Sequence, residues 1–157
     1  MFTKNYYTDL FKVTEAQLQE LTATALKHGG DYCDLYFEHT TFFNLLLKDS
    51  IVSSGGFHTD FGVGIRVLKG EKTGDAYSEN TEMKDMLGAA KAASAIANGS
   101  SSARREYLPV GNRQHDLYPM KENWRDKGAN AFLPFLTNLE KAILAKDNRI
   151  VKVIIRL

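Results

Sequence analysis

The sequence predicts an α+β fold in which an antiparallel meander sheet packs against about three helices, with one layer of helices on one sheet. Three separate stretches repeat apolar residues at helical spacing and end at Gly or Asn, as amphipathic helices do. A long stretch between the first two is rich in aromatic and β-branched residues, which are typical of strands. The length of 157 residues fits a single domain covering 1–157.

The first helix is expected over residues 14–29. Thr14 and Gln17 have the spacing of a capping box, in which each side chain satisfies a free backbone N–H at the start of a helix. The segment ends at Gly29-Gly30, where a helix commonly stops. Its apolar face is formed by Leu18, Leu21, Ala25 and Leu26.

Four or five strands are expected within residues 31–78, separated by turns at 48–50, 53–56 and 69–72. Residues 32–38 alternate polar and apolar side chains, as a strand does when one face meets a core and the other meets water. Residues 61–68 repeat this pattern. Their apolar face carries Val63, Ile65 and Val67, and their other face carries Gly62, Gly64 and Arg66, which leaves the surface around the arginine bare.

The second half of the chain predicts two more helices and a strand. A helix over 81–98 is indicated by an apolar, alanine-rich stripe, and a helix over 130–146 has Pro134 in or at the start of its first turn. Residues 99–127 are too polar for a core and are expected to form a surface excursion. Residues 150–157 predict a strand at which the chain stops. This apolar last strand favours a fragment of a longer protein over a complete small domain.

Composition excludes several classes of function. The 20 Lys and Arg against 19 Asp and Glu give a net charge of +1, so no excess of positive charge points to nucleic acid or to a membrane surface. The single cysteine, Cys33, has no partner for a disulfide, which favours a reducing, cytoplasmic location.

Two glycine motifs resemble nucleotide-binding loops, but each lacks a residue or an order of residues that such a loop requires. Residues 62–67 lack the third glycine that opens a helix in a dinucleotide-binding motif, because Val67 stands there inside a strand. In residues 70–74, Lys72-Thr73 precede the second glycine, whereas a phosphate-binding loop needs them after it. A hairpin turn is the better interpretation of residues 70–74.

No residue is predicted to be catalytic or to bind a metal. The histidines lack the helical His-Glu-x-x-His spacing that places two imidazoles on one face. Cys33 falls on the apolar face of its strand, where a thiol is more often packed than reactive. The histidines are His28, His39, His58 and His115.

Three segments, taken together, closely resemble the amino-terminal domain of the TldD branch of the TldD/PmbA family, also called modulator of DNA gyrase. The segments are residues 30–38, residues 62–67, and the turn Gly70-Glu71-Lys72-Thr73-Gly74 with Ala76-Tyr77. The resemblance implies cytoplasmic, zinc-dependent peptidases that act on unfolded peptides as homodimers or heterodimers. Members carry their metal ligands in the carboxy-terminal half, on a His-Glu-x-x-x-His helix, which no position here matches. The zinc is therefore implied for the complete family member and no cofactor is expected in this chain.

The resemblance implies a non-catalytic domain that shapes peptide access and dimer assembly and is inactive alone. A standalone adaptor domain that regulates a separate catalytic subunit is the alternative, and a nucleic-acid binder is the weakest hypothesis. If any surface meets peptide, the glycine-lined face around Gly62, Gly64 and Arg66 is the candidate, because bare backbone lets a strand approach. The competing interpretation is that the glycines ease sheet twist and that Arg66 is solvated.

Overall fold

The computed structural model describes residues 6–97, 121–122 and 124–157, and the chain divides into two compact units. Unit 1 comprises Met1–His39 and Asp60–Gln114, and unit 2 comprises Thr40–Thr59 and His115–Leu157. Each unit has its own cluster of buried apolar side chains. The division falls within the two longest strands, so each unit is described separately below.

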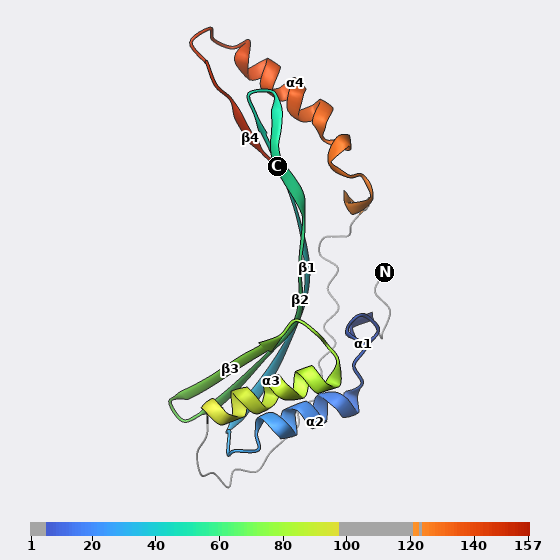
Figure 1. The fold of residues 1–157 in the computed structure, drawn as a ribbon, viewed down its shortest axis with the longest axis vertical. Coiled ribbons are helices and arrows are strands. Elements are labelled where there is room, and N and C mark those ends of the chain that lie inside the picture. Colours follow the sequence, from blue (N-terminus) through green and yellow to red (C-terminus); the bar gives the residue numbers. More distant parts are fainter. Residues whose placement is uncertain (1–5, 98–120, 123) are drawn as a thin grey trace. The chain divides into compact units, whose positions relative to one another are not determined.

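The strands form one open antiparallel sheet in the order β3-β2-β1-β4 (Figure 1). They are β1 (Tyr32–Lys48), β2 (Ile51–Lys69), β3 (Lys72–Ser78) and β4 (Ile154–Arg156). With the helices described below, this confirms the predicted α+β class and its antiparallel sheet.

The predicted turn at residues 53–56 is wrong, and residues 31–78 form three strands instead of four or five. Residues 51–59 are all exposed, so their Ser and Gly residues resemble a turn in composition although the backbone stays extended within β2. The turn between β1 and β2 is the one that the sequence predicts directly after Lys48. Asp49 and Ser50 both have positive φ, 50° and 61°, as a two-residue type I′ hairpin turn requires.

Three of the described helices belong to unit 1: α1 (Tyr6–Phe11), α2 (Glu15–Ala25) and α3 (Met83–Ile96). Thr14 and Gln17 form the capping box that the sequence predicts at the start of α2. The helix ends at Ala25, four residues before the expected end, and Gly29 then takes a φ of 91°. The sequence gives no clear apolar period for the short α1, and this helix was not predicted.

The core of unit 1 lies between the helices and one face of the sheet. Figure 1 shows α2 and α3 side by side against the β1, β2 and β3 strands. Phe11, the last residue of the unpredicted α1, packs its ring 5.1 Å from that of Phe37 and 5.3 Å from that of Phe61. The most deeply buried side chains come from α2, β2 and α3 and include Leu21, Ala25, Val63, Ile65, Val67, Met86, Ala90 and Ala93.

Close packing of α3 on β3 depends on small residues. A Cβ atom at Gly74 would lie 2.1 Å from the carbonyl oxygen of Ala93, a distance that real atoms do not reach. The helix presents Ala90, Ala93 and Ala97 to the sheet, all fully buried. The alanine stripe of the sequence therefore lets the helix backbone approach the strand.

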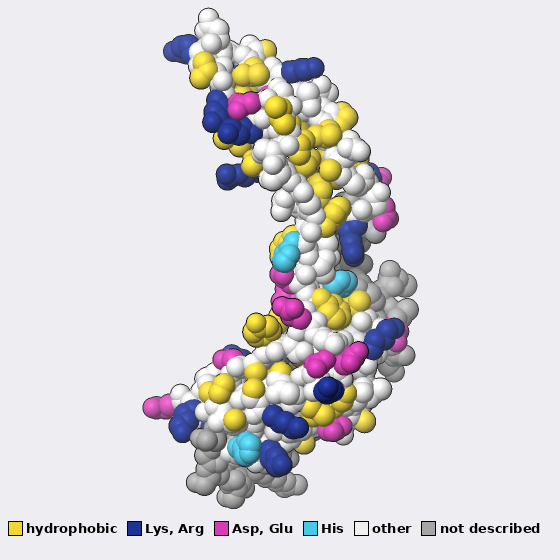
Figure 2. Space-filling view, viewed as in Figure 1, with side chains coloured by type: hydrophobic (Ala, Val, Ile, Leu, Met, Phe, Trp, Pro, Cys, Tyr) yellow, Lys and Arg dark blue, Asp and Glu magenta, His cyan; other side chains and the backbone are white. Residues whose placement is uncertain are grey.

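Unit 2 packs α4 (Leu133–Leu144) against the β1–β2 hairpin and β4, and short 3₁₀ turns at Trp124–Asp126 and Ala129–Ala131 precede this helix. Pro134 lies in the first turn of α4, where a missing N–H costs nothing. Leu136 is buried against Leu45 and Leu47 of β1. The other apolar residues of the helix are largely exposed, and Figure 2 shows apolar side chains gathered on the surface of this part of unit 2.

The last strand is shorter than expected. Only Ile154–Arg156 pair with β1, with Leu47 opposite Ile155, so β4 is an edge strand of the sheet and residues 150–153 lie outside it. Of the predicted surface excursion over 99–127, most lies outside the described residues. Among the helices that the structure describes, none is both long and apolar enough to span a bilayer.

Candidate functional site

The face of the unit 1 sheet opposite α2 and α3 carries the residues that the sequence singled out. Because Val63, Ile65 and Val67 point into the core, their neighbours on β2 point to the other face. Two rows of side chains run across three strands on this face. The charged row consists of Asp34, Arg66 and Asp75, and the tyrosine row consists of Tyr36, Gly64 and Tyr77.

Arg66 is paired within the charged row. Its Nε donates to Oδ1 of Asp34 and its Nη2 donates to Oδ2, both at 2.9 Å, which is a bidentate contact across two strands. The hydrogen bonds that Arg66 donates to Asp34, and then the charge of Asp34, raise the pKa of Arg66, and the nearby charge of Asp75 acts in the same direction. The guanidinium expected to be solvated or to meet a peptide carboxylate thus has a carboxylate partner from its own sheet.

The two glycines of the predicted site differ in kind. Gly62 has a φ of 153°, and a Cβ atom there would lie 2.3 Å from the carbonyl oxygen of Ser78, so this glycine serves close packing of β2 against the end of β3. At Gly64 the nearest atom to such a Cβ is the carbonyl oxygen of Tyr36, at 3.9 Å. Of these two glycines, only Gly64 therefore leaves open space above the sheet.

Gly64 is bordered by two exposed aromatic rings. It lies opposite Tyr77 in the β2–β3 pairing, and Tyr36 lies beside it on β1, two residues along from the Asp34–Arg66 pair. Tyr36 is 64% exposed and Tyr77 is 78% exposed. The tyrosines and Asp75 were not predicted as site residues, although the alternation of residues 32–38 puts Tyr36 on the polar face of its strand.

The turn that carries the family resemblance has a structural role. Gly70 and Glu71 are the two residues of the β2–β3 hairpin turn, and Gly70 has a φ of 55°, which suits glycine. The carboxylate of Asp31 accepts hydrogen bonds from the Gly70 N–H at 3.1 Å and from Nζ of Lys69 at 2.9 Å. Together with the packing of Gly74 on α3, these contacts explain the two glycines of the run Gly70-Glu71-Lys72-Thr73-Gly74 by the structure itself.

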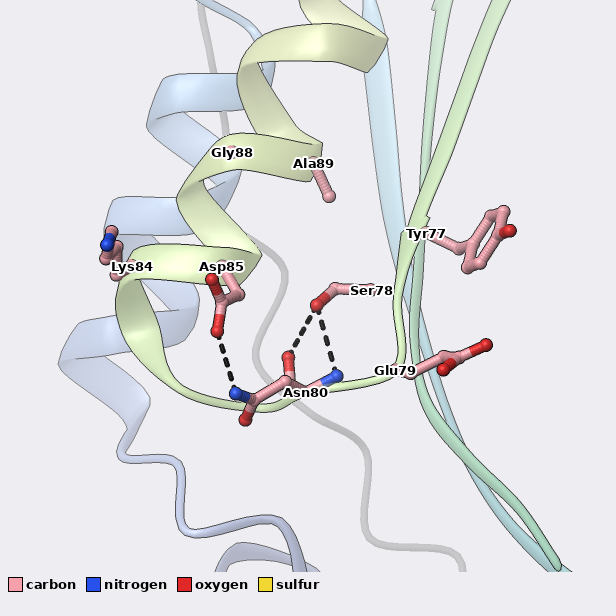
Figure 3. A pocket seen from close by; sticks show the side chains of 8 residues that line it. All are labelled: Tyr77, Ser78, Glu79, Asn80, Lys84, Asp85, Gly88 and Ala89. Atoms are coloured by element: carbon pink, nitrogen blue, oxygen red, sulfur yellow. Dashed lines mark hydrogen bonds between the residues drawn. The ribbon is translucent and has the colours of Figure 1, made fainter.

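An open depression of about 640 Å³ lies where β3 leads into α3. Figure 3 shows Ser78 and Asn80 turned toward the helix, whereas Tyr77 and Glu79 point to the opposite side of the strand. Asn80 accepts a hydrogen bond from the Glu82 N–H and donates one to Asp85 at 2.8 Å. The polar groups of this depression thus bind one another and order the start of α3.

The described residues do not fit a metal site, since no group of three or more His, Cys, Asp or Glu side chains comes together among them. His28 contacts the buried Ser94 hydroxyl through Nδ1 at 3.2 Å, His39 packs edge-on against Phe61, and His58 stacks on Phe42. His115 lies outside the described residues. We therefore assign no catalytic step to a metal held by this part of the chain.

Cys33 is not an activated nucleophile. Burial, followed by the charge of Asp34, raises the pKa of its thiol from 9.0 to about 11. The group is therefore protonated at neutral pH, whereas a nucleophilic cysteine needs a lowered pKa.

Comparison with known proteins identifies the family. Residues 33–97, which include the charged row and the tyrosine row, match the family model of PmbA/TldA metallopeptidase domain 1. The chain belongs to the PmbA/TldD family. It is 32% identical over 129 residues to a metalloprotease TldD homolog of Haemophilus influenzae, and 34% identical over 91 residues to one of Buchnera aphidicola. These alignments cover 78% and 58% of this PmbA/TldD chain.

Solved structures share the fold of this PmbA/TldD chain. A protein of Bacteroides thetaiotaomicron named as a modulator of DNA gyrase superposes with a TM-score of 0.63 at 16% identity, over 99% of this chain and 35% of that one. TldE from Thermococcus kodakarensis superposes with a TM-score of 0.54 at 14% identity, over 89% of this chain and 34% of that one. The chain spans only 26% and 18% of the two metalloprotease relatives.

Proposed function

We propose that this chain acts as the amino-terminal, non-catalytic domain of a TldD-like zinc metallopeptidase. The observation that carries the proposal is the match of residues 33–97 to the first domain of a metallopeptidase family. In this role the domain shapes the access of unfolded peptides to a zinc centre that other parts of the complete protein supply. It also contributes to a homodimer, or to a heterodimer with a family member, in the cytoplasm.

The exposed sheet face of unit 1, which carries Tyr36 and Tyr77, is the part of the domain best suited to meet peptide. The open space at Gly64 lets another backbone approach the sheet closely. The exposed apolar side chains of unit 2 support the assembly role, because contiguous exposed apolar surface commonly marks a protein interface.

A domain replacement tests the proposal. The segment of the Haemophilus influenzae TldD homolog that aligns with this chain would be replaced by this chain, and cleavage of casein by the chimera would be measured with zinc supplied. We expect chelator-sensitive cleavage by the chimera and none by the homolog with the segment deleted. Equal cleavage by the deletion protein and the chimera would show that the domain has no part in peptide access.

A further inference from the structure

The exposed face of the unit 1 sheet, which carries the charged row and the tyrosine row, combines carboxylates with exposed aromatic rings. Arg66 is held by Asp34 through two hydrogen bonds, so its charge is met within the sheet. Asp75 stands opposite Arg66 on β3 and is exposed. Two carboxylates against one guanidinium leave the charged row with one negative charge in excess.

The tyrosine row adds a second feature that favours a cation. The rings of Tyr36 and Tyr77 stand on either side of Gly64, which has no side chain to fill the space between them. The two strands that flank β2 lie about 10 Å apart, because neighbouring strands are spaced by about 4.8 Å. A long side chain fits into such a gap with an aromatic ring beside it. The positive end of lysine or arginine is attracted to the face of such a ring.

We propose that the tyrosine row takes a lysine or arginine side chain of an extended peptide, with Asp75 as the carboxylate that meets its charge. The inference rests on the proposed function, in which the domain meets unfolded peptide, and it names the peptide class as basic. The long apolar stem of lysine or arginine packs along the tyrosine rings while its charged end reaches the carboxylate. An acidic side chain in the same place would meet the negative excess of the charged row and be repelled.

Binding of labelled peptides by the full chain tests this inference. The probes are unstructured Gly-Ser peptides of about twelve residues that carry lysine, or glutamate at the same positions, with fluorescence anisotropy as the readout. We expect the lysine peptide to bind more tightly than the glutamate peptide. The preference shrinks as salt is raised, because these groups are exposed and their interaction is screened.

Four variants locate the binding on the face. Tyr36→Ala and Tyr77→Ala each remove one ring, and we expect each to weaken binding of the lysine peptide about two- to fivefold, the range for an exposed cation–π contact. Asp75→Asn keeps the shape of the side chain and removes its charge, which weakens the lysine peptide selectively. Gly64→Val fills the floor between the rings, where the backbone leaves room, and abolishes the preference.

Gly56→Val is the matched control for Gly64→Val. Gly56 is also on β2, has no atom within 4 Å of an added Cβ, and lies in unit 2 instead of unit 1. We expect this variant to bind the lysine peptide as the parent chain does, with thermal melting used to confirm that all variants fold.

Three outcomes overturn the inference. Equal affinity for the lysine and glutamate peptides contradicts a basic preference. A preference for lysine that survives both Asp75→Asn and Gly64→Val contradicts its location on this face, and absence of binding to any peptide contradicts both. None of these outcomes decides the proposed function, because activity of the chimera is measured with casein and depends on no charge preference.

Discussion

Glu140 of α4 holds the turn of the β1–β2 hairpin through Ser50. Its Oε1 accepts a hydrogen bond from the Ser50 N–H at 2.8 Å, and its Oε2 accepts one from the Ser50 hydroxyl at 2.7 Å. The glutamate is only 2% exposed, and these hydrogen bonds offset the cost of burying its carboxylate. The turn has positive φ at both central residues, and the helix thereby fixes a backbone conformation that non-glycine residues seldom adopt.

Removing this carboxylate should weaken unit 2. We expect Glu140→Ala to lower the free energy of unfolding by about 2 kcal/mol, the usual range for hydrogen bonds to a charged group. Glu140→Gln should cost less, because one oxygen still accepts from the Ser50 N–H. Chemical denaturation measures both, and hydrogen exchange at Ser50 reports the local effect. Glu20→Ala, at an exposed position of α2, is the control, and an unchanged exchange rate at Ser50 in Glu140→Ala would contradict this account.

Substitution by alanine should have opposite effects on stability at two glycines of unit 1. Gly74→Ala places a methyl group against the Ala93 carbonyl, where the distance would be 2.1 Å, and should destabilise the domain by about 1–3 kcal/mol. Gly88→Ala lies on α3 with no atom within 4 Å of the added Cβ, and should stabilise the domain by about 1 kcal/mol, because alanine favours helix over glycine. Thermal melting compares them. Equal melting temperatures for the two variants would mean that α3 does not approach β3 as described.

Lys12 offers a stabilising substitution at the end of α1. Its φ is 57°, in the left-handed region that suits glycine at the end of a helix. We expect Lys12→Gly to raise the free energy of unfolding by about 0.5–1 kcal/mol, because glycine adopts this conformation without a clash at Cβ. Glu15→Gly, within the first turn of α2, is the control and should destabilise the chain. A loss of stability in Lys12→Gly would contradict the left-handed conformation.

Cys33 should react slowly with alkylating reagents in the folded protein. Its pKa rises from 9.0 to about 11, which lowers the thiolate fraction at neutral pH about a hundredfold, and its partial burial slows access further. Between pH 9 and about 11 the thiol stays protonated in the folded state but loses its proton in the unfolded state. The contribution of this group to the stability of the fold is therefore fully present below pH 9 and is lost as the pH rises toward 11. Iodoacetamide labelling at pH 7.5, with and without denaturant, measures the difference. Equal rates in the two states would rule out a shielded thiol.

Much of unit 1 could be predicted because its pattern is regular. The strand at residues 61–68 alternates strictly, and the capping box at Thr14 marks the start of its helix without tertiary information. The short α1 could not be predicted, because Phe11 is held by packing against the rings of Phe37 and Phe61, which are distant in the sequence. Residues 53–56 resemble a turn in composition, yet the extended backbone of β2 includes them, because the true turn at residues 49–50 already reverses the chain.

The candidate site was only half predictable for a similar reason. Gly64 and Arg66 stand out within one strand, so sequence alone identifies them. Their neighbours in the site, Asp34 and Tyr77, come from the adjacent strands. These could not be identified, because a single sequence does not show which residues of two strands lie opposite one another. Gly62 shows the opposite case, because its neighbour Ser78 makes it a packing residue and removes it from the open surface.

A peptidase assay on the 157-residue chain alone tests the central claim most directly. The chain would be incubated with unfolded casein and supplied zinc, with and without a chelator, and new peptide ends would be counted. The account predicts no cleavage above the buffer control, because the proposed function assigns catalysis to other parts of the complete protein. Cleavage by this chain that the chelator abolishes would contradict the account and would place a working metal centre among its own residues.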